Sequence, residues 1–180
     1  MKGRQTEMSE MLANKMLFNG HRFPGSIHLY ISDRKSHTSK FSNLRIKEWA
    51  LQASPILEKI APSRNHTAET LPFSNGSRAY FHSAWSDFEE ARSVPADFVY
   101  LDELQSVNVE QINVLMETLA HSKHGFLVGV GTGTVEGSDW PSYISLARNT
   151  NGPSKQKPGR PAIQVHLSTH TTYRRLSSPG

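Results

Sequence analysis

Two spacings of apolar residues alternate along the chain, one typical of helices and one typical of strands. A period near 3.6 predicts helical segments in three regions: 5–19, 37–60 (one or two helices) and 107–120. Short apolar runs or alternation predict three strands: 26–31, 98–101 and 125–130. Asn75-Gly76 predicts a hairpin over 71–84, and Asn19-Gly20 is expected to end the first helix. Because strands and helices follow one another in turn, the expected fold class is α/β, a mainly parallel sheet with flanking helices.

The same period assigns an inward face to the second helical region. Its apolar members are Phe41, Leu44, Trp49, Leu51, Ile56 and Leu57. The three tryptophans, Trp49, Trp85 and Trp140, are interpreted as packing residues in the core or the hairpin rather than as platforms for stacked bases.

The regular pattern ends after Trp140. Residues 148–180 show no sustained period, and Gln164–Leu167 is the only stretch there with a pattern compatible with a strand. We therefore divide the chain into a domain over 1–140 and an irregular or disordered tail over 141–180.

Charge supports this division. The net charge is +4, but residues 141–180 carry 6 Lys+Arg and no acid, so residues 1–140 have a net charge of −2. The basic excess therefore lies in the tail and does not indicate that the folded part binds nucleic acid. The absence of cysteine excludes disulfides and thiolate zinc sites. No apolar run approaches the ~20 residues of a membrane span, which favours a soluble, cytosolic protein.

The candidate chemistry lies at the end of the strand 98–101, which stops at two adjacent carboxylates, Asp102 and Glu103. In open α/β sheets, ligands bind at the carboxyl ends of the strands. One carboxylate there can hold Mg²⁺ and its neighbour can orient and deprotonate a water, which is the Walker B arrangement of a nucleotide triphosphatase. The alternative is a strand that ends in a solvated acidic turn.

A second segment precedes the first helix: Lys2-Gly3-Arg4-Gln5-Thr6-Glu7-Met8-Ser9. A standard phosphate loop, Gly-x-x-x-x-Gly-Lys-Ser/Thr, requires a glycine and a lysine just before its serine or threonine. Here Glu7 and Met8 stand at those positions, so only Ser9 matches, and Lys2 lies at the opposite end of the segment.

With its leading lysine and closing serine, this segment resembles the phosphate loop of the large terminase subunits of tailed phages. Other segments resemble the same family, in the same order: Asn75-Gly76-Ser77, Ser83-Ala84, Ala91-Arg92-Ser93, the Walker B run Asp97 to Glu103, and Gly131-Thr132-Gly133-Thr134, which follows the strand 125–130 as a turn and resembles the coupling motif. The resemblance covers roughly residues 2–140 and implies a P-loop (ASCE-type) ATPase fold that is incomplete.

The resemblance implies ATP and Mg²⁺ as cofactors and a role for each matching residue. Asp102 and Ser9 would hold the metal, Glu103 would activate water, and Arg92 would act as an arginine finger in a neighbouring subunit. The implied nucleotide-binding residues are Lys2, Arg4, Gln5, Ser9, Thr132 and Thr134. The implied partners are double-stranded DNA, the portal protein, the small terminase subunit and further copies in a ring, without a membrane, in the host cytoplasm.

Departures from the family pattern lead to further expectations. Glu7 places a negative charge where the family has glycine, the sequence begins at the loop itself, and no nuclease half follows the coupling motif. We therefore expect a fragment of a motor, weakly active or inactive. Shifted-frame translations of parts of the tail resemble the family, and the hypothesis is that the reading frame changes between about 141 and 148.

Alternatives remain open at this stage. Asp-Glu-Leu-Gln (102–105) also resembles a helicase box, and the contrasting class is a non-enzymatic remnant that binds no nucleotide. His121 and His124 have the spacing of metal ligands but are interpreted as a solvated helix end. For Arg92, the alternative is a salt bridge within the fold.

Overall fold

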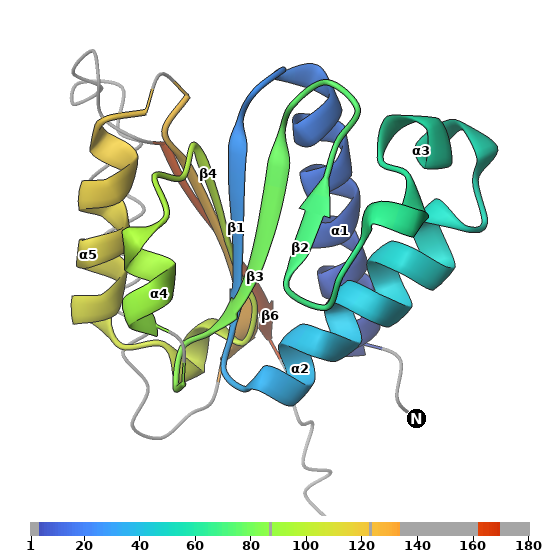
Figure 1. Cartoon of the computed structure of the whole chain (residues 1–180). Helices are drawn as coiled ribbons and strands as arrows, with labels where there is room; N and C mark the ends of the chain where they lie inside the picture. The colour runs from blue at the N-terminus through green and yellow to red at the C-terminus, as the bar shows by residue number, and fades with distance from the viewer. Residues whose placement is uncertain (1–3, 87, 123, 134–161, 170–180) are drawn as a thin grey trace, which may run out of the picture.

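A six-stranded sheet forms the centre of the molecule, with strand order β2-β3-β1-β4-β5-β6 (Figure 1). The computed structural model describes residues 4–86, 88–122, 124–133 and 162–169; for 4–7, 132, 133 and 162–169 it describes the backbone. The strands are β1 (Ile27–Ser32), β2 (Thr70–Pro72), β3 (Arg78–Ser83), β4 (Phe98–Leu101), β5 (Phe126–Gly133) and β6 (Ala162–Thr169). Only β2 runs antiparallel, against β3, and the other five strands are parallel. The expected α/β class with a mainly parallel sheet is confirmed.

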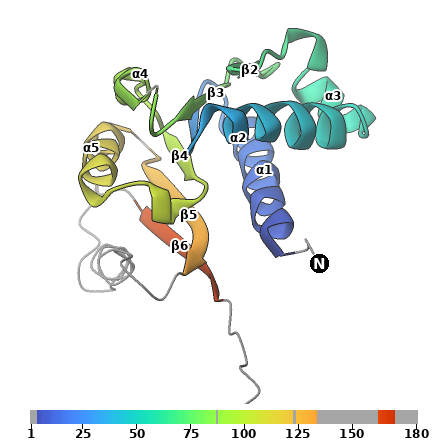
Figure 2. The same ribbon diagram turned by 90° about the horizontal axis from the view of Figure 1, so that it is seen from below.

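Helices cover both faces of this sheet (Figures 1 and 2). One face carries α1 (Arg4–Arg22), α2 (Lys35–Lys40), the π-helix η1 (Phe41–Leu51) and α3 (Pro55–Ile60). The other carries α4 (Phe88–Ser93) and α5 (Val109–Ala120). Two short 3₁₀ turns, η2 (Ser63–Asn65) and η3 (Leu104–Ser106), complete the described elements.

Strand β4 shows how the sheet separates two cores. All four of its residues are buried, because helices cover both faces of a parallel sheet. Phe98 and Tyr100 belong to the core beneath α1 and η1, whereas Val99 and Leu101 belong to the core beneath α4 and α5. Side chains alternate along a strand, so Asp102, the next residue, continues on the α1 face.

The first helix does not end at Asn19-Gly20 as expected but continues to Arg22. Gly20 is required for close packing instead: a Cβ built there would lie 2.3 Å from Cζ of Phe73. Asn75, in the hairpin loop, donates its side-chain amide to the carbonyls of Gly20 (2.8 Å) and His21 (3.0 Å). The chain turns only at Gly25, with φ of +73°. The helix end and the hairpin are thus built against one another.

Replacing Gly20 by alanine is expected to destabilise the protein, although alanine is the better helix former. Overpacking lowers the free energy of unfolding by up to about 3 kcal/mol. The better helix propensity of alanine offsets about 1 kcal/mol of this loss. The net loss in the free energy of unfolding should therefore be about 2 kcal/mol, measured by urea denaturation. In a Phe73→Ala background the same change should be neutral or stabilising. A similar loss in both backgrounds would contradict the contact with Phe73 as the cause.

The second helical region departs most from the helical-period prediction. Phe41 and Leu51 are buried as expected, but Leu44, Trp49 and Ile56 are exposed. For Leu44 and Trp49 the reason is η1, in which the amide of Gln52 donates to the carbonyl of Lys47, five residues back. A π-helix turns less per residue than an α-helix, so a period of 3.6 assigns its faces wrongly. Trp85, also expected to be packed, is exposed with its ring against Arg34.

The predicted hairpin forms, as β2 and β3 with Asn75-Gly76 in the connecting loop. Helix α5 is also confirmed, with Ile112, Leu115 and Leu119 buried. Within the tail, which was interpreted as irregular or disordered, the structure has a regular strand around the compatible stretch Gln164–Leu167: β6 pairs in parallel with the whole of β5. Trp140 and the proposed boundary at 140/141 lie outside the described residues. None of the described helices has the length and apolar character needed to cross a membrane.

Candidate functional site

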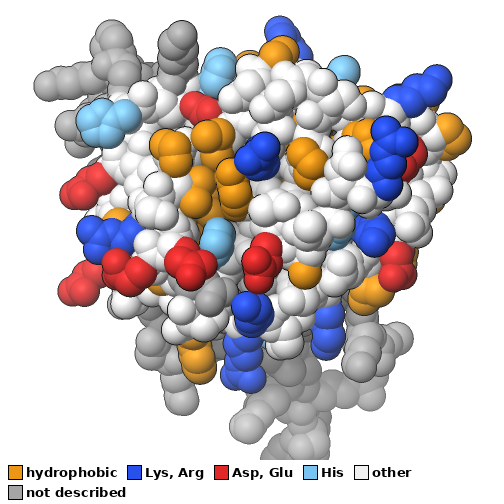
Figure 3. Space-filling view, viewed as in Figure 1, with side chains coloured by type: hydrophobic (Ala, Val, Ile, Leu, Met, Phe, Trp, Pro, Cys, Tyr) orange, Lys and Arg blue, Asp and Glu red, His pale blue; other side chains and the backbone are white. Residues whose placement is uncertain are grey.

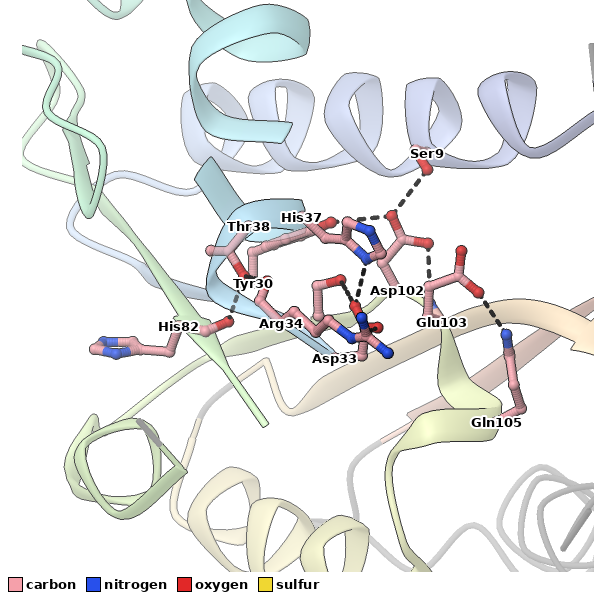
Figure 4. Close-up of polar contacts among 11 residues, drawn as sticks. Ser9, Tyr30, Asp33, Arg34, His37, Thr38, His82, Asp102, Glu103 and Gln105 are labelled. Carbon is pink, nitrogen blue, oxygen red and sulfur yellow. Dashed lines mark hydrogen bonds and ion pairs between the residues drawn. The ribbon is translucent and has the colours of Figure 1, made fainter. Parts of the chain in front are cut away.

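The carboxyl ends of β1, β3 and β4 meet at one edge of the sheet. The register aligns Ser32 with Ser83 and Ile31 with Leu101, so Asp33 follows β1 one residue beyond the level at which Asp102 follows the neighbouring strand β4. Open α/β sheets bind their ligands at this edge. Helix α1 reaches the same edge with Ser9, near its N-terminus (Figure 4).

Asp102 is held by three hydrogen bonds. Its Oδ2 accepts from Oγ of Ser9 at 2.8 Å and from the hydroxyl of Tyr30 at 2.9 Å, and its Oδ1 accepts from the amide of Glu103 at 3.0 Å (Figure 4). The buried hydroxyl of Tyr30 has a pKa well above its usual value, because burial and then the charge of Asp102 disfavour the phenolate. Tyr30 therefore donates and Asp102 remains a fixed acceptor.

Glu103 adopts an unusual backbone conformation, with φ of 54° and ψ of 50°. It is the only non-glycine residue with positive φ in the described part of the chain. Its carboxylate accepts a short hydrogen bond from the side-chain amide of Gln105. Burial raises its pKa, the charges of Asp102 and Asp33 add to this, and the bond from Gln105 opposes it. Strained residues of this kind cluster at functional sites.

A second carboxylate, Asp33, lies at the end of β1, and the sequence analysis did not single it out. It is buried and accepts from Nδ1 of His37 at 2.6 Å and from Oγ of Ser32 at 3.2 Å, with Nε of Arg34 at 3.5 Å (Figure 4). The signal was present, since Asp33 follows the strand predicted at 26–31 much as Asp102 follows β4. Unlike Asp102, Asp33 is not followed by a second acid in the sequence.

Comparison with known proteins bears on the fold. No protein-family model matches the chain, and no curated protein sequence matches it either. Among solved structures, the large terminase ATPase domain of Thermus phage P74-26 superposes with a TM-score of 0.62 at 18% identity, covering 92% of this chain and 72% of that one. An arginine-to-alanine mutant of the same domain gives a TM-score of 0.56 at 16% identity, covering 92% and 73%.

The chain has the fold of a large terminase ATPase domain. At this level of identity the likeness concerns the arrangement of the elements alone.

Within the terminase ATPase fold, three of the residues singled out from the sequence come together: Ser9, Asp102 and Glu103. The hydroxyl of Tyr30 reaches the same place, through its hydrogen bond to Asp102. From the sequence, Tyr30 was assigned to a strand and given no role in the site. Arg4 and Gln5 form the first turn of α1, and Thr132 lies in β5. Lys2 and Thr134 lie outside the described residues. Gly131–Gly133 was expected as a turn but extends β5 at the carboxyl edge, paired with β6.

Arg92 is not brought to this cluster within the chain. It lies on α4, exposed, and pairs with Glu89 at 3.1 Å. Helix α4 covers the face of the sheet opposite to α1. The ion pair predicted as the alternative is therefore present, and a role in catalysis would require a neighbouring subunit.

The oxygen ligands of the cluster suit magnesium. Ser9 supplies a hydroxyl, and Asp102 and Glu103 supply carboxylates, which are the hard oxygen donors that Mg²⁺ prefers. Among the described residues, no group of three or more acidic, histidine or cysteine side chains could hold a metal. Mg²⁺ is commonly bound by one or two carboxylates together with waters and substrate phosphates. The oxygen donors of Ser9, Asp102 and Glu103 are therefore of the kind that Mg²⁺ takes from proteins.

Proposed function

We propose that this chain is the ATPase portion of a phage terminase large subunit, which hydrolyses ATP to power the packaging of double-stranded DNA into the procapsid. The observation that carries the proposal is the hydrogen bond from Ser9 to Asp102 beside Glu103. It joins the beginning of a helix to a pair of carboxylates at the carboxyl edge of a parallel sheet. The terminase ATPase fold supports the proposal independently of these residues.

Each residue has a role in this proposal. Bound magnesium would neutralise phosphate charge, with Ser9 and Asp102 as its protein contacts. Glu103 would orient the attacking water and accept its proton, and burial raises its pKa, which makes it a stronger base than an exposed glutamate. The amides of the first turn of α1, with Lys2, Arg4 and Gln5, would bind the phosphates, because a helix N-terminus favours anions.

Other roles would require further components. Thr132 and Thr134 would respond to the γ-phosphate, and Arg92 would reach the site of the next subunit in a ring. The proposed partners are DNA, the portal protein and the small terminase subunit, in the host cytoplasm. Figure 3 shows acidic side chains gathered over the α4 and α5 side of the face in view. The exposed acids of these helices are Glu89, Glu90, Glu110 and Glu117. The phosphate backbone of DNA would be repelled there, so we do not place the DNA contact on this side.

Nucleotide-dependent stabilisation tests the proposal against a non-enzymatic remnant. A non-hydrolysable ATP analogue with magnesium at 100 times its dissociation constant should stabilise the fold by ~2.7 kcal/mol. For a chain of this size the melting temperature should rise by about 5–10 °C in differential scanning fluorimetry. The same analogue with EDTA is the control and should give a smaller shift. No shift at millimolar magnesium and nucleotide would favour the remnant.

A further inference from the structure

Tyr30 is a fully buried tyrosine whose hydroxyl reaches the candidate metal site. Its ring stacks on Phe41 of η1, with centroids 3.8 Å apart, and approaches Phe81 of β3. Its hydroxyl donates to Oδ2 of Asp102 at 2.9 Å (Figure 4). The apolar part of the side chain is thus fixed by packing, while its one polar atom is directed at the carboxylate.

The strand register explains why Tyr30 meets Asp102. Tyr30 of β1 lies opposite Tyr100 of β4, so Asp102 is its diagonal neighbour, two residues further along β4. Residues two apart on a strand share a face, and diagonal neighbours lie within reach of an aromatic side chain. Ser9 approaches from α1, which covers this same face. A tyrosine at position 30 can therefore reach from β1 to the carboxylate of Asp102 while its ring stays in the core.

The three hydrogen bonds limit how Asp102 can bind a cation. A carboxylate has about four acceptor positions. Ser9 and Tyr30 take two on Oδ2, and the amide of Glu103 takes one on Oδ1. Among the described donors, no other hydrogen bond to this carboxylate is present, so the remaining acceptor position is on Oδ1, the oxygen next to Glu103.

We propose that Tyr30 is a positioning residue for the metal site: its hydroxyl fixes the carboxylate of Asp102 so that Oδ1 faces the cation or a water bound to it. The inference rests on the proposed function, since it presumes a magnesium–nucleotide site. Partners of metal ligands hold them in orientation, and losing one typically lowers metal affinity about 10–100-fold.

The test compares two substitutions of buried tyrosines that each remove one hydroxyl. Tyr30→Phe keeps the stacked ring and removes the hydrogen bond to Asp102. Tyr100→Phe is the matched control, because Tyr100 is equally buried on the neighbouring strand and its hydroxyl contacts Asn19 and His28 instead. Binding of Mn²⁺ in the presence of a non-hydrolysable ATP analogue is measured by electron paramagnetic resonance. Nucleotide binding is measured separately in EDTA.

Tyr30→Phe should weaken Mn²⁺ binding about 10–100-fold and leave metal-free nucleotide binding unchanged, whereas Tyr100→Phe should alter neither. If Tyr30→Phe lowers the melting temperature but binds Mn²⁺ as the wild type does, Tyr30 has only a packing role and the inference is wrong, while the proposed function stands. Equal losses of Mn²⁺ affinity in both variants would also overturn the inference. A wild-type chain that binds neither Mn²⁺ nor nucleotide would overturn both proposals.

Discussion

Glu103→Gln is expected to lower ATP turnover about 10²–10⁴-fold, the usual cost of losing a general base, while magnesium–nucleotide binding persists. Glutamine keeps the size of the side chain and its ability to accept from Gln105. It cannot accept a proton from water. Turnover is measured by phosphate release and binding by the thermal shift described above. On the acid side of the pH–rate profile, the pH at which turnover falls to half should lie above the ordinary pKa of a glutamate, because burial raises the pKa of Glu103.

Two further variants sharpen this expectation. Glu117→Gln makes the same chemical change at an exposed position of α5 and should leave turnover unchanged. Asp102→Asn should mainly weaken metal-dependent binding, because it removes the charge that faces the cation. If Glu103→Gln and Asp102→Asn weakened binding equally, the division between base and metal ligand would be wrong.

Acidification from pH 7 to pH 4 is expected to cost the fold about 3 kcal/mol through His28 alone. His28 is buried on β1, stacked on Phe98, and burial lowers its pKa from 6.5 to about 4. Asn19 donates to the hydroxyl of Tyr100, which can donate to Nδ1 of His28. Nε2 then carries the proton and donates to Oγ of Ser26. All of these bonds are satisfied by the neutral ring.

The direction of this pH effect follows from which state of the chain, unfolded or native, binds the proton. Between pH 6.5 and about 4, the unfolded chain protonates this histidine and the native chain does not. The stabilisation is therefore fully present above pH 6.5 and is lost as the pH falls to about 4. Urea denaturation at a series of pH values should show this slope. His28→Gln, which cannot titrate, should reduce it, while the exposed His21→Gln should not. An unchanged slope in His28→Gln would rule out His28 as the cause.

The sequence predicted those parts of the fold in which local pattern and tertiary environment agree. A fully apolar run predicted β4, and the two acids that follow it, Asp102 and Glu103, were predicted to lie at the carboxyl edge of the sheet. It failed where backbone geometry departs from the standard period, as in η1, where a π-helix moved Leu44 and Trp49 to the surface. At Asn19-Gly20 the turn signal was outweighed by tertiary packing against Phe73.

Contacts across the sheet were beyond the reach of sequence patterns. In the sequence, nothing distinguishes Tyr30 from other aromatic residues in strands. Its contact with Asp102 follows only from the register in which β1 pairs with β4. Asp33 gains importance only because β1 and β4 are neighbours, although the hairpin lies between them in the sequence. The pairing of β6 with β5 likewise depends on a long-range contact, since the tail has a weak local pattern.

The long sequence separations within the site also have a kinetic consequence. Ser9 and Asp102 are 93 residues apart, and Tyr30 and Asp102 are 72 apart. Closing such loops costs entropy before any contact compensates for it, so topologies of this kind fold slowly compared with helical bundles. The three side chains cannot meet before α1, β1 and β4 have all been assembled. The arrival of the Ser9–Asp102 bond therefore reports that α1 and the central strands β1 and β4 have come together, whatever the state of the strands added later.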